Sequence, residues 1–147
     1  MDLPVRFAPV VSAPVSGVRV RVVAALIAHP KGGRFLIQQR LPGARRGLLW
    51  EFPGGKVESG ESDAQALVRE CREELGVELS VGKCRWMGRH RYEDVEVELV
   101  LYEAEILRGT PAPLGAHALR FASLEEMRGL AFCDADLPLL DALASAE

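Results

Sequence analysis

Four acidic side chains in one short stretch of the sequence are the residues best suited to carry chemistry. Glu70, Glu73 and Glu74 recur at spacings of three and four residues, which would place their side chains on one face of a helix. Glu61 precedes them where a glycine-containing loop meets that helix. Like charges at these spacings repel, and a divalent cation such as Mg²⁺ would relieve the repulsion, because it binds carboxylates together with phosphates and water. A solvated acidic face is the commoner interpretation of such glutamates, so the neighbouring residues must decide.

These neighbours favour a ligand site. The Gly54-Gly55 pair comes before the helix and would allow backbone groups to approach a ligand closely. Arg69 lies directly before the first glutamate, and its guanidinium can hold adjacent carboxylates through paired hydrogen bonds. Together these features indicate a site for a metal ion and an anionic ligand.

A helix is expected over residues 62–75, where it would carry the three glutamates. Ser62 and Gln65 can form a capping box at its start. Gly76 can end it in the left-handed conformation that glycine adopts without strain.

The remaining sequence predicts the elements around this helix. Alternating and continuous apolar runs predict strands over residues 18–29, 34–40, 86–91, 95–107 and 119–121. A capping box of Ser123 and Glu126 predicts a short helix, and a terminal helix is expected over 136–144. The segment 49–61 has too many glycines to predict a regular element. The order of elements favours one mixed α/β or α+β domain, with helices packed on a largely mixed sheet.

Composition and charge are those of a small soluble domain. The chain of 147 residues is 48% hydrophobic and 27% charged, and we expect a flexible leader over 1–17 and a single domain over 18–147. The net charge of −3 argues against binding to polymeric nucleic acid. No secretory signal or membrane span is predicted, and three scattered cysteines indicate reduced thiols in the cytoplasm.

The acidic stretch resembles the signature of the Nudix hydrolase family. Its fixed positions are, in order, Gly55, five residues, Glu61, seven residues, Arg69-Glu70, Glu73-Glu74 and Gly76. Cys71 stands where the family usually has a larger aliphatic residue, and a buried thiol can serve there as a small hydrophobe. The segments WEFPGGK at 50–56 and ADLPL at 135–139, together with Arg40, resemble parts of the MutT-type branch.

The resemblance implies the Nudix fold, a mixed sheet between helices. It also implies Mg²⁺-dependent hydrolysis of a nucleoside triphosphate to a nucleoside monophosphate and pyrophosphate, with Mn²⁺ able to substitute. The small nucleotide would be bound by a monomer or a homodimer. The implied catalytic residues are Arg69, which would orient the glutamates, and Glu70, Glu73 and Glu74. The implied metal ligands are the same three glutamates, Glu61 and the carbonyl of Gly55. The implied substrate contacts are Arg40, Phe52, Gly54, Lys56 and Asp136.

One position departs from the MutT pattern. Gly115 stands where MutT-type members often carry a further glutamate, which leaves the number of metal ions and the general base open. Glu103 and Glu105 are candidates to replace it, although their alternation with apolar residues suggests a solvent-exposed face. Two other functions also stay open: hydrolysis of ADP-ribose, a diphosphate sugar or a dinucleoside polyphosphate, and nucleotide binding without catalysis.

Recognition of the base leaves several alternatives. Asp136 would either cap the last helix or accept hydrogen bonds from a base, which would favour cytosine or 8-oxoguanine over uracil and thymine. Phe52 or Trp50 could stack on the base, although core packing suits Trp50 equally well. Arg40 is either a ligand contact or a charge at the end of a hairpin.

Overall fold

A computed structural model describes residues 6–7 and 19–145 of the chain. The expected leader over 1–17 therefore falls outside the described residues, except for a two-residue strand, β1 (Arg6–Phe7), which pairs in parallel with β6. The described part contains mixed sheets and helices, and the predicted mixed α+β architecture is confirmed. No helix in this part is long and apolar enough to cross a membrane.

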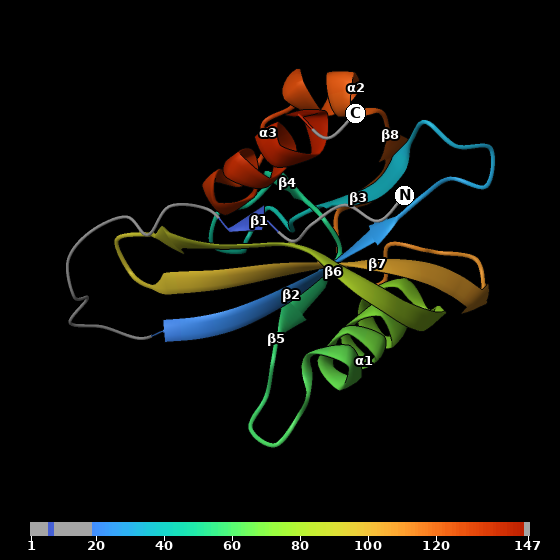
Figure 1. The fold of residues 1–147 in the computed structure, drawn as a ribbon, viewed down its shortest axis with the longest axis horizontal. Helices are drawn as coiled ribbons and strands as arrows, with labels where there is room; N and C mark the ends of the chain where they lie inside the picture. The colour runs from blue at the N-terminus through green and yellow to red at the C-terminus, as the bar shows by residue number, and fades with distance from the viewer. Residues whose placement is uncertain (1–5, 8–18, 146–147) are drawn as a thin grey trace.

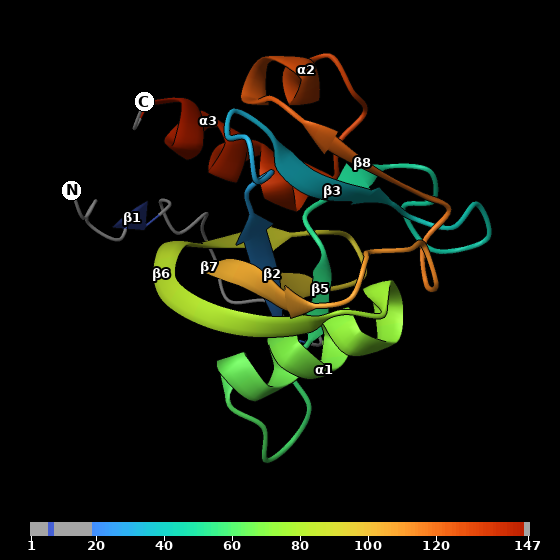
Figure 2. The ribbon, with the colours of Figure 1, turned by 90° about the vertical axis from the view of Figure 1, so that its right-hand side faces the viewer.

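A five-stranded sheet in the order β1-β6-β7-β2-β5 forms the middle layer (Figures 1 and 2). Its long strands are β2 (Arg19–Ile27), β6 (Glu78–Arg91) and β7 (Glu96–Arg108). Strand β2 pairs in parallel with β7, whereas β6 and β7 form an antiparallel pair with bulges near Val81 and Cys84. The sheet is thus mixed, and β2 is an interior strand between β7 and β5, where its continuous apolar half is buried on both faces.

One face of this sheet is covered by α1 (Asp63–Leu75), as Figure 1 shows. The predicted capping box is present, because the Ser62 hydroxyl accepts from the Gln65 N–H and the Gln65 side chain accepts from the Ser62 N–H. Gly76 ends the helix at φ 71°. Buried side chains of α1 pack on the sheet through Leu67 and Leu75, which fixes the glutamate-bearing face beside the sheet.

The opposite face is covered by a second layer. It contains a three-stranded sheet in the order β4-β3-β8, formed by β4 (Trp50–Glu51), β3 (Phe35–Gln39) and β8 (Ala118–Ala122). The helices of this layer are α2 (Leu124–Arg128), a 3-10 turn η1 (Asp134–Asp136) and α3 (Leu137–Ser145). The capping box of Ser123 and Glu126 is present as predicted.

The glycine-rich segment at 49–61 corrects the sequence prediction. A lack of regular structure is expected there, but the segment contains β4 and β5 (Gly54–Lys56), and β5 pairs with the centre of β2. Gly54 has a φ of 154°, and a Cβ there would collide with the backbone of Val23, so only glycine permits this pairing. Tertiary hydrogen bonding therefore outweighs the low strand propensity of the two glycines.

Strand β6 is also longer than predicted. The sequence indicates residues 86–91, whereas the strand begins at Glu78, directly after α1, and its first half is irregular. The bulges interrupt the alternation of apolar and polar residues, which removes the pattern on which the prediction depends.

Candidate active site

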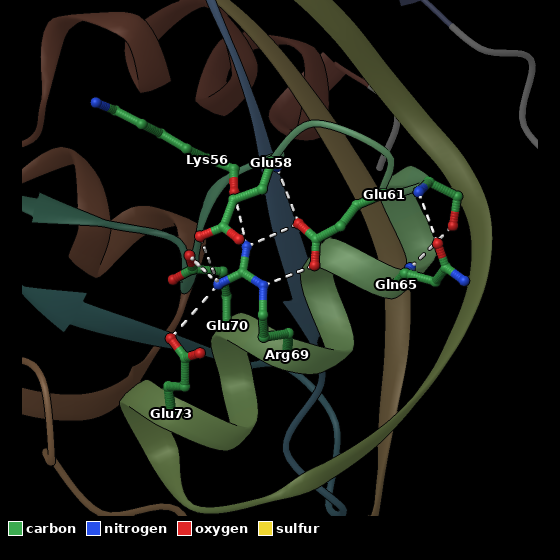
Figure 3. A network of polar contacts seen from close by, with 8 residues as sticks. Lys56, Glu58, Glu61, Gln65, Arg69, Glu70 and Glu73 are labelled. Carbon is green, nitrogen blue, oxygen red and sulfur yellow. Dashed lines mark hydrogen bonds and ion pairs between the residues drawn. The ribbon is translucent and has the colours of Figure 1, made fainter.

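Arg69 lies at the centre of the acidic stretch and joins the helix to the glycine-rich segment (Figure 3). Its Nε and Nη2 donate to the two carboxylate oxygens of Glu61 at 2.7 and 2.9 Å. Its Nη1 donates to Glu70 at 2.9 Å, and Nη2 also donates to the Lys56 carbonyl at 3.0 Å. Glu73 lies further off, with 3.4 Å between its Oε2 and Nη1. One guanidinium thus fixes two carboxylates and the end of β5.

Both oxygens of Glu61 are occupied within the protein. Besides Arg69, the backbone N–H of Glu58 donates to Glu61 at 2.9 Å. Hydrogen bonds from Arg69 and from this N–H lower the pKa of Glu61 to about 2. The structure therefore places Glu61 as the partner that holds Arg69, next to the other glutamates.

Glu70 and Glu74 place two carboxylates close together in a partly buried part of the site. Burial raises the pKa of Glu70 even though Arg69 opposes the shift. Burial, and then repulsion from Glu70, raises the pKa of Glu74. Added positive charge would lower both values, so the donor set suits a hard divalent cation.

Two glycines make room for these carboxylates. An added Cβ at Gly55 would lie 2.8 Å from Oε1 of Glu70 and closer to the rest of that carboxylate. An added Cβ at Gly115 would lie 3.0 Å from Oε1 of Glu74 and closer still to the other two atoms of that carboxylate group. Gly115, the position that departs from the MutT pattern, therefore lies directly against a glutamate of the acidic stretch.

The predicted ligands do not form a ready coordination shell. Among residues 6–7 and 19–145, no three His, Cys, Asp or Glu side chains converge on a point where they could hold a metal ion as they stand. Glu73 points outward, with its side chain 58% exposed. Ligation by Glu70, Glu73 and Glu74 together would require side-chain rotations within this cluster.

Glu103 and Glu105 lie outside the acidic stretch. Glu103 forms an ion pair with Arg85 at 3.0 Å, and Glu105 is exposed. Both line a separate hollow at the other end of β7. Neither side chain therefore substitutes for the glutamate that MutT-type members often carry at the position of Gly115.

A pocket of about 170 Å³ opens beside the acidic stretch. Its walls come from β2, the β4–β5 segment, the start of β7, the segment with Arg40 and Arg46, the turn after β6, and η1. All of the predicted substrate contacts line it: Arg40, Phe52, Gly54, Lys56 and Asp136. Gly55 lines it too, so this residue borders both the pocket and the Glu70 carboxylate.

Asp136 is buried in the wall of this pocket, 5% exposed. Its Oδ2 accepts from the Phe52 N–H at 3.2 Å, and α3 begins only at Leu137. Asp136 thus stands at the N-cap position of α3, but the hydrogen bond that its side chain accepts ties η1 to the β4–β5 segment instead of capping the helix. Burial, and then repulsion from Glu51, holds the pKa of Asp136 well above its usual range.

Arg40 and Glu51 form a pair on the same wall. The Arg40 Nη1 lies 3.2 Å from Glu51 Oε1, and Gln38 Nε2 donates to Glu51 at 3.0 Å. Arg40 also donates from Nε to the Arg45 carbonyl at 2.9 Å, so it is more than a charge at the end of a hairpin. Sequence reasoning missed Glu51, although it lies within the WEFPGGK segment that drew attention to its neighbours.

The two aromatic candidates occupy different places. Phe52 lines the pocket but is only 3% exposed and packs near Phe132, with 6.1 Å between ring centroids. Trp50 packs against the core of the second layer and does not line the pocket. Core packing is therefore the role that the structure gives Trp50.

The comparisons agree with this geometry. A model of the NUDIX domain family matches residues 23–142, and the chain belongs to this family. It is a Nudix hydrolase of the MutT-like kind, as the resemblance predicted. It is 41% identical over 126 residues to the CTP pyrophosphohydrolase of Escherichia coli K12, covering 84% of this chain and 90% of the relative. It is 34% identical over 118 residues to a putative 8-oxo-dGTP diphosphatase 2 of Mycobacterium tuberculosis, covering 78% and 81%.

A solved structure supports the same assignment. The solution structure of the E. coli ORF135 protein matches with a TM-score of 0.74 and 37% identity, over 90% of this chain and 94% of that one. Nudix hydrolases generally need a divalent metal ion, which agrees with the surplus of negative charge at Glu70 and Glu74.

Proposed function

We propose that this enzyme hydrolyses a nucleoside triphosphate to a nucleoside monophosphate and pyrophosphate, with cytosine nucleotides preferred and 8-oxo-dGTP as the second candidate. One observation carries the proposal: the pocket that holds Asp136 and the acidic stretch share Gly55 as a common border. A nucleotide with its base beside Asp136 would carry its phosphates toward Glu70. The names of the relatives, a CTP pyrophosphohydrolase and an 8-oxo-dGTP diphosphatase, agree with such a ligand.

The metal would be held by Glu70, Glu73, Glu74 and the Gly55 carbonyl, with Glu61 beside them. Mg²⁺ is the ion that we propose, with Mn²⁺ as a substitute, because carboxylate and phosphate oxygens suit both. When bound, the ion neutralises phosphate oxygens and lowers the pKa of an attacking water.

The chain's own residues position the reactants. Arg69 orients Glu70 and keeps Glu61 ionised, and it ties both to β5 through the Lys56 carbonyl. The exposed ammonium of Lys56, at the mouth of the pocket, offers a counter-charge to the triphosphate. Water attacks one phosphorus in line, the bond to the bridging oxygen breaks, and pyrophosphate leaves.

Asp136 would recognise the base. Its Oδ2 is engaged by the Phe52 N–H, so the rest of the carboxyl group is available to an amino group on a base. Cytosine and 8-oxoguanine carry such a group, whereas uracil and thymine do not. A buried polar group that is left unpaired costs about 1–3 kcal/mol, which is sufficient for a clear preference.

The test is a substrate panel of normal and oxidised nucleoside triphosphates, ADP-ribose and diphosphate sugars, scored for pyrophosphate against phosphate release. We expect CTP or dCTP to give the highest kcat/KM, with pyrophosphate as product. Asp136→Asn keeps an acceptor for the Phe52 N–H, and it should lower the ratio of kcat/KM for CTP to kcat/KM for UTP. Orthophosphate as the main product, or hydrolysis of diphosphate sugars alone, would refute the proposal.

We also propose a cytoplasmic enzyme with one domain over 18–147, acting as a monomer or homodimer on small nucleotides. All three cysteines are free thiols, and Cys71 and Cys133 are buried, which suits a reducing compartment. Light scattering of the purified chain would give the oligomeric state, and a higher assembly would contradict this part.

A further inference from the structure

The loop over residues 41–49 crosses to the turn between β6 and β7 at the edge of the pocket. Arg45 Nη1 pairs with Asp94 Oδ2 at 2.8 Å, and Arg46 Nη1 pairs with Asp94 Oδ1 at 3.1 Å. Arg46 has a φ of 56°, a left-handed conformation that side-chain-bearing residues rarely adopt. Such a conformation persists only where surrounding contacts enforce it, and here those contacts are made by the Arg46 side chain and its neighbours.

The guanidinium of Arg46 lies against the face of an aromatic ring of the pocket. Its Cζ is 3.9 Å from the centroid of the Tyr92 ring, within the range of a cation–π contact. Among the described residues, Arg46 donates only through Nη1, so its Nε and Nη2 have no hydrogen-bond acceptor there. The side chain is 25% exposed and lines the pocket. A fixed guanidinium with free donors is suited to bind an acceptor that enters the pocket.

Tyr92 links Arg46 to the segment that carries Asp136. The Tyr92 hydroxyl accepts from the Ala135 N–H at 2.9 Å, while its ring supports Arg46. Arg46, Tyr92 and Asp136 all line the pocket, so these contacts place Arg46 and Asp136 at the same end of it. Arg46 therefore belongs to the base end of the pocket.

We propose that Arg46 is a specificity-determining residue, which donates hydrogen bonds to a carbonyl oxygen of the base while Tyr92 and Asp94 hold it in place. This inference rests on the proposed nucleotide pocket and adds a second recognition element to Asp136. Asp136 selects for an amino group, and Arg46 selects for a carbonyl. Cytosine and guanine-type bases carry both groups, uracil carries only carbonyls, and adenine carries only the amino group. Asp136 alone would not reject adenine, and Arg46 alone would not reject uracil, but the two residues together would select bases that carry both groups.

The experiment compares kcat and KM for CTP, UTP, ATP and inorganic tripolyphosphate, which has no base. The variants are Arg46→Gln and Arg46→Gly, with Arg45→Gln as the matched control. Arg45 pairs with the same Asp94, but its side chain is 73% exposed and does not line the pocket. Arg46→Gly relieves the left-handed backbone, so folding is retained, and melting temperatures check this for each variant.

Both Arg46 variants should lower kcat/KM for CTP and UTP by about 10- to 100-fold, mainly through KM, as expected for lost hydrogen bonds from a charged donor. ATP and tripolyphosphate should change little, so the ratio of CTP to ATP hydrolysis falls while that of CTP to UTP stays constant. Arg45→Gln should leave all four substrates unchanged.

Three results would overturn the proposal. An equal loss for CTP, ATP and tripolyphosphate would make Arg46 a phosphate contact. An equal effect of Arg45→Gln would show that the loop matters only through its ion pairs with Asp94. Unchanged kinetics in both Arg46 variants would exclude any contact with the base. Failure of the proposed function itself would be seen separately, as a wild-type enzyme that hydrolyses no nucleoside triphosphate.

Discussion

Substitution of Gly55 by alanine tests whether the position of the Glu70 carboxylate controls catalysis. The added methyl group would lie 2.8 Å from Oε1 of Glu70 and closer to the other carboxylate atoms. Ordinary van der Waals separations are about 3.5–4.0 Å, so the carboxylate must move by roughly 1 Å or more. Such a shift breaks the 2.9 Å hydrogen bond from Arg69 and displaces a proposed metal ligand.

The expected effect is large on turnover and small on stability. A displacement of about 1 Å in a positioned catalytic group costs on the order of 100-fold in rate, or roughly 2.7 kcal/mol of activation free energy. Gly55 does not have a positive φ, so alanine suits its backbone, and a lost ion pair at a partly exposed site costs about 1 kcal/mol or less.

The assay is pyrophosphate release from CTP at several Mg²⁺ concentrations, together with thermal melting of each variant. Gly129→Ala is the control, because the nearest atom to an added Cβ there is at an ordinary 3.5 Å. We expect the Gly55→Ala enzyme to have a lower kcat and to require a higher Mg²⁺ concentration for half-maximal activity. Its melting temperature should stay near that of the wild type. Wild-type kcat and metal dependence in the Gly55→Ala enzyme would refute the importance of this contact.

Three further predictions follow from the same packing and charges. Gly115→Ala should push the Glu74 carboxylate away and lower kcat by about tenfold or more with little change in melting temperature, and unaltered turnover would contradict the role of Glu74. Excess EDTA should abolish activity, and Mg²⁺ or Mn²⁺ should restore it, whereas full activity in EDTA would exclude a metal mechanism. Asp63, which accepts from Arg21 Nε at 2.8 Å and from the Tyr102 hydroxyl, has a pKa held below its ordinary value of 3.8, mainly by Arg21. Its stabilisation is therefore present above pH 3.8 and is lost as pH falls through the folded-state pKa. Asp63→Asn should lower the free energy of unfolding by about 1–2 kcal/mol at pH 7 in urea titrations, and a deficit that persists undiminished at strongly acidic pH would contradict the ionic origin.

Local signals determined the helix that carries the acidic stretch. Ser62, Gln65 and Gly76 specify the start and end of α1 through contacts within a few residues, so the sequence was sufficient. The spacing of Glu70, Glu73 and Glu74 follows from the helical period, and together with the other fixed positions of the signature it was sufficient to identify the family.

Long-range contacts determined the rest of the site, and no local pattern records them. Gly54 and Gly55 form a strand only because β2 offers unpaired backbone groups and because a side chain at 54 would collide with Val23. Asp136 accepts from Phe52, 84 positions earlier in the chain, so its burial and its raised pKa could not be read from its neighbours. Arg46 and Tyr92 meet only where two loops cross, and the tertiary structure alone shows that they share one pocket with Asp136, because a contact between distant segments leaves no periodic signal in the sequence.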